Sequence, residues 1–124
     1  GDVFRRNADG TLDFADRAKY LIKTGGENVY PAEIERVLMA DPHVTDAAVV
    51  RVPDERWGEA PLAFVSCDAD SVTEESLLTN CRAALARYKL PREIRIIAFE
   101  DFPRSTSGKI QRHVLEARLR DEEG

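Results

Sequence analysis

The sequence contains little of what marks several broad classes of protein. Its 124 residues include only two cysteines and two histidines, too few for a disulfide framework or a zinc cluster. No apolar run approaches the roughly 20 residues that span a bilayer. Acidic residues outnumber basic residues by 23 to 18, so the basic surface of a general nucleic-acid binder is also missing. These absences predict a protein without a transmembrane segment, a metal site or a nucleic-acid partner.

Length and composition predict one globular domain. A length of 124 residues lies within the usual range for a domain, and 43% hydrophobic with 33% charged residues is an ordinary balance. Cys67 and Cys81 both lie in apolar patterns, which favours free thiols over a disulfide framework. The first ten residues lack the apolar core of a secretory signal. We therefore expect the protein to work in a reducing compartment, the cytoplasm.

Apolar spacing and turn residues predict an α+β fold. Pro31 has the preset φ of a first helical position, and the apolar residues that follow it recur with helical spacing. The predicted elements are a hairpin over 3–14, a strand over 20–22 that Gly25 and Gly26 terminate, a helix over 31–40, strands over 47–52 and 62–67 connected through 57–60, a helix that begins after Thr73 and ends before Pro91, a strand over 93–99, and a helix over 111–120. Together they predict a small three-stranded sheet covered by helices, with an additional β-hairpin.

The loop Pro103–Lys109, with the sequence PRSTSGK, is a candidate binding site. Its hydroxyl side chains, flexible Gly108 and cationic Lys109 suit an anion such as a phosphate or a carboxylate. It is not a Walker loop, because the leading glycine and the hydroxyl residue after the lysine are missing. Spacing alone leaves two interpretations open: an anion site, or a loop whose lysine is simply solvated.

Five segments of the chain, taken in order, resemble the C-terminal domain of the AMP-forming acyl-CoA synthetases, members of the adenylate-forming superfamily. The segments are GDVF, DRAKYLIKTGGENVYPAEIERVL, DAAVVRVPDERWGEA, YKLPREI and FPRSTSGKIQR, and they extend from residue 1 to about residue 119. The resemblance implies a ligase that activates a carboxylic acid, fatty or related, with ATP to give acyl-AMP and pyrophosphate. The acyl group is then transferred to CoA. ATP, Mg²⁺ and CoA are the implied cofactors.

The first residues also resemble a feature of that family. Gly1 and Asp2 are similar to the end of a Thr-Gly-Asp motif that closes the large N-terminal domain. We therefore expect residues 1–124 to be a C-terminal domain whose N-terminal partner domain belongs to the same polypeptide and holds the acyl pocket and most of the ATP and Mg²⁺ site. Within the chain, 1–18 is expected to form a hairpin and a segment leading to a hinge, and 20–119 a compact lid.

For the first half-reaction, the resemblance implies roles for four residues. Lys109 matches the catalytic lysine that bridges the substrate carboxylate and the α-phosphate while negative charge develops on phosphorus. Asp2 matches the acid that holds the ribose hydroxyls of ATP or AMP, and Arg17 matches an arginine that contacts the same ribose and phosphate region. Lys19 falls at the hinge, where a change in one residue's φ and ψ swings the lid. Many relatives carry aspartate there, so only the backbone of Lys19 is assigned a role.

For the second half-reaction, the resemblance implies that the lid presents a different surface. Gly25 and Gly26 match a loop that lines the pantetheine tunnel, where the absence of Cβ allows close approach of the backbone. Lys23, just before this loop, is implied to orient the thioester step.

The resemblance also implies a nucleotide contact for CoA. Trp57 and Tyr88 match positions at which some relatives hold the CoA adenine by aromatic contact, and Arg92 matches a basic contact to the nucleotide phosphate. Leu90 stands where some relatives have a second cation. This departure implies either a weaker contact to the phosphate or a contact that comes from Lys89.

Two other functions compete with this interpretation. One is a ligase that loads the pantetheine of a carrier protein, against which Trp57, Tyr88 and Arg92 argue. The other is a non-catalytic module that binds an anion or a partner, which Lys109 and Asp2 disfavour. The loop around Lys109 also resembles one that is reversibly acetylated in relatives, which implies a lysine acetyltransferase as a partner. On its own, the chain is expected to lack ligase activity.

Overall fold

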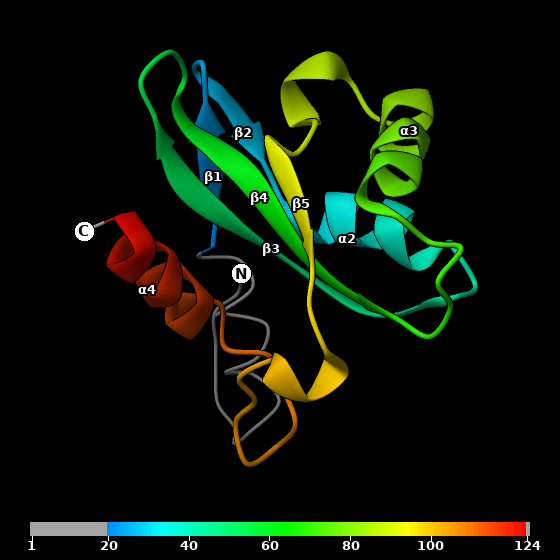
Figure 1. Cartoon of the computed structure of the whole chain (residues 1–124). Helices are drawn as coiled ribbons and strands as arrows, with labels where there is room; N and C mark the ends of the chain where they lie inside the picture. The colour runs from blue at the N-terminus through cyan, green and yellow to red at the C-terminus, as the bar shows by residue number, and fades with distance from the viewer. Residues whose placement is uncertain (1–19, 124) are drawn as a thin grey trace, which may run out of the picture.

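Residues 20–123 are described by the computed structural model of the chain, and they form a five-stranded sheet with helices on both faces (Figure 1). The strands are β1 (Ile22–Thr24), β2 (Glu27–Val29), β3 (Val44–Asp54), β4 (Gly58–Cys67) and β5 (Glu93–Ile96). The helices are α2 (Pro31–Met39), α3 (Glu74–Ala84) and α4 (Arg112–Glu123), with short 3₁₀ helices η1 (Arg87–Lys89) and η2 (Phe99–Asp101). The predicted α+β class is confirmed. The hairpin predicted over 3–14 lies outside the described residues.

The long β3–β4 hairpin is the centre of the sheet. Its strands pair antiparallel along their whole length, and the other edge of β4 pairs with β1 at Gly58 and, in parallel, with β5 over Leu62–Val65. Strand β2 pairs with β1. Within residues 20–123, β3 therefore has one strand neighbour and forms an outer edge of the sheet.

Alternating side chains of the hairpin build two cores, one on each face of the sheet. Along β3, Ala47 and Val49 belong to the core under α2 and α3, whereas Ala48 and Val50 belong to the core under α4, as the two-residue repeat of a strand requires. The helices complete these cores with buried side chains at Ile34, Leu38, Leu77 and Cys81 on one face, and at Leu115 and Leu119 on the other. Both faces of the sheet are thus covered, and the outer edge of β3 remains to be satisfied by other groups.

Helices α2 and α4 agree closely with their predicted ranges, whereas α3 ends at Ala84 and the separate 3₁₀ helix η1 lies between it and Pro91. Helix α2 begins with Pro31 in its first turn. Helix α3 is capped by Thr73, whose side chain accepts from the N–H of Ser76 while the Ser76 hydroxyl accepts from the N–H of Thr73. Helix α4 extends to Glu123, past the predicted helix end at 120 and lid end at 119. No helix within the described part of the chain is long and apolar enough to cross a membrane.

The strands depart from the prediction at the turn between β3 and β4. A carboxylate oxygen of Asp54 accepts from the N–H groups of Arg56 and Trp57, each at 2.9 Å. These bonds close a tight turn and bring β4 into register directly after it. The prediction that residues 58–60 lie in a connection was therefore wrong, since they are part of β4 and only Trp57 stays in the turn.

The sheet also has two strands more than predicted. The segment predicted to end at Gly25 and Gly26 instead continues through that turn into β2, so that β1 and β2 form a hairpin joined to the sheet. Alternation did not indicate β2, because only its last residue, Val29, is buried. The strand predicted over 93–99 ends at Ile96, and the chain then forms η2.

Candidate functional site

The loop over residues 103–109, called the Lys109 loop below, turns back on itself between η2 and α4. At its base, Arg104 and Ile110 form an antiparallel bridge. Nearer its tip, the N–H of Ser105 donates to the carbonyl of Lys109 at 2.8 Å. The backbone of Lys109 is therefore held in place while its side chain lies at the exposed surface.

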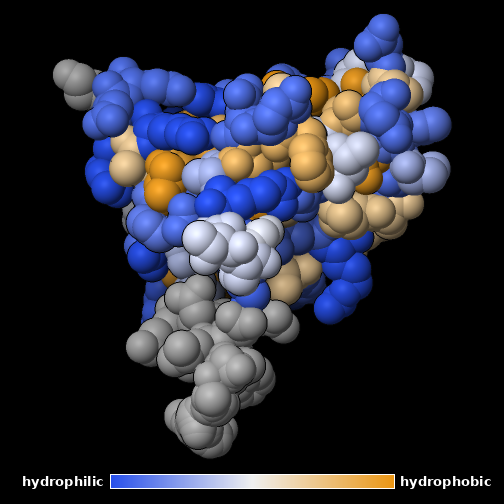
Figure 2. Space-filling model, turned by 90° about the horizontal axis from the view of Figure 1, so that it is seen from below, coloured by the Kyte–Doolittle hydropathy of each residue, from blue (hydrophilic) through white to orange (hydrophobic). Residues whose placement is uncertain are grey.

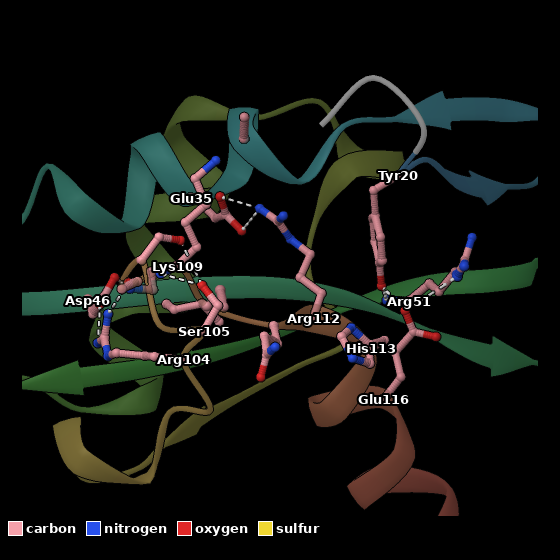
Figure 3. Close-up of a pocket in the computed structure, with 17 residues that line it drawn as sticks. Tyr20, Glu35, Asp46, Arg51, Arg104, Ser105, Lys109, Arg112, His113 and Glu116 are labelled. Atoms are coloured by element: carbon pink, nitrogen blue, oxygen red, sulfur yellow. Dashed lines mark hydrogen bonds and ion pairs between the residues drawn. The ribbon is translucent and has the colours of Figure 1, made fainter. Parts of the chain in front are cut away.

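Two ion pairs anchor this loop, one on each side of its tip. Before the tip, the Arg104 guanidinium lies 2.6 Å from a carboxylate oxygen of Asp46, near the start of β3. After the tip, Arg112 reaches both carboxylate oxygens of Glu35 on α2, at 2.8 and 3.0 Å. Figure 3 shows the two acids approaching the loop from different elements. Arg104 makes one contact to its acid, whereas a single nitrogen of Arg112 contacts both oxygens of Glu35. Partly shielded pairs of this kind contribute more than pairs at the open surface, where water screens the charges.

The same two acids also bond to the outer edge of β3. The N–H of Ala47 donates to Asp46 at 2.9 Å, and the N–H of Val49 donates to Glu35 at 2.8 Å. Arg112 donates to the carbonyl of Val49 at 3.2 Å. Glu35 and Arg112 together therefore satisfy both backbone groups of Val49, as a neighbouring strand would.

A tyrosine side chain accepts the next outward-facing N–H along the edge of β3, that of Arg51. The N–H of Arg51 donates to the hydroxyl of Tyr20 at 3.0 Å, and that hydroxyl donates to Glu116 on α4. The guanidinium groups of Arg51 and Arg112 lie 4.8 and 5.4 Å from the centre of the Tyr20 ring. Burial raises the pKa of Tyr20 well above its usual range, and the hydrogen bond to Glu116 raises it further. The phenol therefore stays protonated and links α4 to β3.

The Lys109 loop, the β3 edge and the start of α4 border an open groove of about 790 Å³ (Figure 3). Its charged lining consists of Arg51, Arg104, Lys109 and Arg112 with Glu35, Asp46 and Glu116, and His113 also contributes. Seen from below, the surface of the molecule mixes hydrophilic and hydrophobic side chains (Figure 2). Four cationic against three acidic side chains in the lining give the groove a small positive excess, which suits an anion.

The residues predicted to contact CoA gather at the opposite end of the sheet, where the β1–β2 and β3–β4 turns lie side by side (Figure 1). The N–H of Gly25 donates to the carbonyl of Trp57 at 2.8 Å. Gly25 has φ +59°, and a Cβ there would lie 2.8 Å from the Trp57 ring. Gly26 has φ +86°, with nothing within 4 Å of such a Cβ. Glycine at position 25 thus allows the indole to pack on the backbone while 49% of Trp57 stays exposed.

The predicted basic contacts to CoA are engaged in the protein. Lys89 lies 2.8 Å from Glu33, and this hydrogen bond raises the pKa of the lysine. Arg92 donates to the carbonyl of Pro53 at 3.0 Å, which holds it against the β3–β4 turn. A phosphate at this end would have to share or exchange these contacts.

The remaining predicted positions divide into two groups. Tyr88 is exposed next to Lys89, and Lys23 is an exposed residue of β1 whose N–H donates to Glu59 at 2.9 Å. Asp2, Arg17 and Lys19 lie outside the described residues.

In residues 20–123, no three His, Cys, Asp or Glu side chains are grouped so as to hold a metal ion.

With this geometry, comparison with known sequences decides the family. The profile of the AMP-binding enzyme C-terminal domain matches residues 33–109. The chain belongs to this family. The matched range includes Trp57 and ends at Lys109, whereas Gly25 and Gly26 lie just before its start.

Relatives in the AMP-binding enzyme C-terminal domain family include several CoA ligases. The chain is 45% identical over 115 residues to a long-chain-fatty-acid–CoA ligase of Mycobacterium tuberculosis, covering 93% of this chain and 22% of that enzyme. It is 46% identical over 116 residues to a 2-succinylbenzoate–CoA ligase of Geobacillus, with 93% and 23% covered. The chain thus spans about a fifth of the length of these relatives.

Solved structures in the AMP-binding enzyme C-terminal domain family have the same fold. The structure of apo MatB from Rhodopseudomonas palustris matches with a TM-score of 0.79 and 38% identity, over 87% of this chain and 21% of that chain. A fatty acyl CoA synthetase of Mycobacterium tuberculosis matches with a TM-score of 0.74 and 45% identity, over 81% and 20%.

Sequence reasoning did not find the groups that hold the Lys109 loop. Glu35 falls within the helix predicted over 31–40 and Tyr20 within the strand predicted over 20–22, and neither was assigned a part in the site. The one available signal was the pair of arginines, Arg104 and Arg112, on the two sides of Lys109. Their acidic partners come from segments 58 and 77 residues away, so spacing could not identify them.

Proposed function

We propose that this chain is the C-terminal lid domain of an AMP-forming acyl-CoA ligase that works with an N-terminal domain of the same polypeptide. The observation that carries the proposal is the separation of two sites. Lys109 lies at one end of the β3–β4 hairpin, whereas Gly25 and Trp57 lie at the other. A single reaction centre can meet both ends only if the lid turns between two half-reactions.

In the first half-reaction, the carboxylate of the acid attacks the α-phosphorus of ATP, and pyrophosphate leaves. The Lys109 ammonium would lie between the carboxylate and the α-phosphate and stabilise the charge that develops there. The anchored backbone of Lys109 supports this role, because a preorganised cation needs little rearrangement as the charge forms. Mg²⁺, which the N-terminal domain would hold, would neutralise negative charge on the phosphates of ATP.

In the second half-reaction, the thiol of CoA attacks the acyl carbonyl and AMP leaves. The turn at Gly25 and Gly26 would line the path of the pantetheine arm, with Lys23 beside it. The half-exposed Trp57 ring, with the Arg56 guanidinium 4.9 Å from its centre, offers an aromatic contact for adenine. Tyr88 would be a second aromatic group, and Lys89 or Arg92 the contact to phosphate.

The relatives are named for two classes of carboxylic acid. One relative carries the name of a long-chain fatty acid ligase and another that of a 2-succinylbenzoate ligase, and we propose a fatty or related organic acid. The exposed Trp57 favours free CoA over a carrier protein as acceptor. A cytoplasmic location and acetylation of Lys109 by a lysine acetyltransferase stay predictions.

The test is an assay of the ligase that contains this chain, with ATP, CoA and a panel of carboxylic acids, following AMP release. We expect AMP release that depends on both the acid and CoA. AMP release with a carrier protein but not with CoA would show that the thiol acceptor is the carrier protein. A failure to adenylate any of the acids would overturn the proposal. The 124-residue chain alone is expected to give no turnover, because it supplies Lys109 without an acyl pocket.

A further inference from the structure

The C-terminal segment from the Lys109 loop into α4 docks on the outer edge of β3 through three side-chain bridges. Each bridge contains one group that accepts from an N–H of β3 and also bonds to the segment. The bridges are Asp46 with Arg104, Glu35 with Arg112, and Tyr20 with Glu116, and they serve the N–H groups of Ala47, Val49 and Arg51. Because these N–H groups alternate along one strand, the bridges follow the register of β3.

The middle bridge is the most complete of the three. Glu35 binds Arg112 through both carboxylate oxygens and the N–H of Val49 through one of them. Arg112 in turn binds the carbonyl of Val49. The side chains of Glu35 and Arg112 are only 17% and 23% exposed, and Arg112 follows Lys109 by three residues. A shift of Arg112 would therefore move the C-terminal side of the Lys109 loop.

From this geometry we infer that Glu35 and Arg112 are positioning residues for Lys109. The inference rests on the proposed function for its chemistry. Neither side chain is assigned a contact with substrate. They act by fixing the loop that carries the Lys109 ammonium, because a misplacement of a reacting or charge-stabilising group by about 1 Å can lower the rate on the order of 10²-fold. The pair should therefore matter for acyl-AMP formation and not for thioester formation, in which the other end of the lid faces the reaction centre.

Two conservative variants break the bridge in different ways. Glu35→Gln keeps the shape and an oxygen that can accept from Val49, but it removes the charge. Arg112→Lys keeps the charge but replaces with a single ammonium the two guanidinium nitrogens that bind Glu35 and the carbonyl of Val49. Glu122→Gln is the matched control, because both oxygens of Glu122 accept from one nitrogen of Arg95, at 2.8 and 3.0 Å, away from the groove.

The first measurement does not depend on any enzymatic function. Backbone ¹⁵N relaxation of the 124-residue chain reports the order parameters of residues 105–109. We expect order parameters of about 0.85 in the unaltered chain to fall to about 0.6 or below in Glu35→Gln and Arg112→Lys. The order parameters of β3 and β4 should stay unchanged in both variants, and Glu122→Gln should change none of them. Retained order in β3 and β4 shows that each variant is folded. An unchanged loop in both folded variants would overturn the inference.

The second measurement separates the half-reactions in the ligase that contains this chain. Both variants are expected to lower kcat for acyl-AMP formation about 10- to 100-fold, with thioester formation from supplied acyl-AMP within about twofold of normal. The double variant should be no worse than the poorer single variant, because the two residues act as one unit. Equal losses in both half-reactions, or additive losses, would overturn the positioning role. Full adenylation by Lys109→Ala would instead overturn the proposed function, and the loop measurement would still decide whether the bridge orders the loop.

Discussion

The two ends of this small domain are built in different ways. At the Lys109 end, charged side chains from α2, β3 and α4 hold an exposed loop through paired contacts. At the opposite end, backbone geometry determines the arrangement. Gly25 has a positive φ, its N–H donates to the carbonyl of Trp57, and the indole of Trp57 packs against Gly25.

This difference suits two kinds of recognition. A cation that must meet developing charge gains from a fixed, charged surrounding, because the surrounding dipoles need not reorganise. An aromatic platform and a glycine turn instead offer flat contact area to a nucleotide and a narrow arm without demanding a charge. The comparison predicts that variants at one end will disturb one half-reaction and leave the other nearly intact.

The largest effect is expected at Lys109. In the complete ligase, Lys109→Ala should slow acyl-AMP formation by about 10²-fold or more, by analogy with the loss of one preorganised charge-stabilising group. Thioester formation from supplied acyl-AMP should change much less. Rapid-quench assays of each half-reaction measure both values, and equal losses would contradict the division of labour between the two ends.

The next effect is expected at Trp57. Trp57→Ala removes a stacking surface worth about 1–3 kcal/mol, which corresponds to a rise in KM for CoA of about 5- to 150-fold. Acyl-AMP formation should stay near normal, since Trp57 lies away from the Lys109 groove. Tyr30→Ala, which removes another half-exposed ring, is the control. A normal KM for CoA in the folded Trp57 variant would assign the indole to packing alone.

A smaller effect is expected at Gly25, where the chain supplies its own comparison. Gly25→Ala and Gly26→Ala both place a side chain at positive φ, at a cost of about 1–2 kcal/mol each. Only the first would bring its Cβ within 2.8 Å of the Trp57 ring. Urea unfolding should therefore show a greater loss for Gly25→Ala.

Fluorescence gives a second measure of this pair, because Trp57 is the only tryptophan in the chain. We expect the emission maximum to shift in Gly25→Ala and to stay in place in Gly26→Ala. Identical spectra in the two variants would show that the indole does not depend on close approach at position 25.

The smallest effect concerns Tyr20 and appears only in alkali. Its pKa is higher in the folded chain than the usual 10.0, so the unfolded chain loses the proton first as pH rises. The contribution to stability is complete below about pH 10 and declines above it, by up to about 1.4 kcal/mol per pH unit. Urea titrations from pH 8 to 11 should show a decline in the unaltered chain that is shallower in Tyr20→Phe. Parallel curves would exclude Tyr20 as the cause.

Local sequence determined most elements of this domain. Pro31 and the apolar repeat after it define α2, Thr73 caps α3, and Gly25 with Gly26 marks a turn, because each depends on the conformational preferences of residues close in the chain. The motif around Lys109 likewise identified the residue that we propose as catalytic. These features need no knowledge of distant segments.

The tertiary structure alone decided how the Lys109 loop is held and where the two candidate sites lie. Strand β3 is an outer edge because β1 and β5 pair with the opposite edge of β4 and not with β3. Its outward N–H groups then required partners, and Tyr20 and Glu35 reached them from segments far away in the chain. Hydrogen bonds and ion pairs act over a few ångströms of space regardless of sequence separation, so no pattern of residues could reveal them.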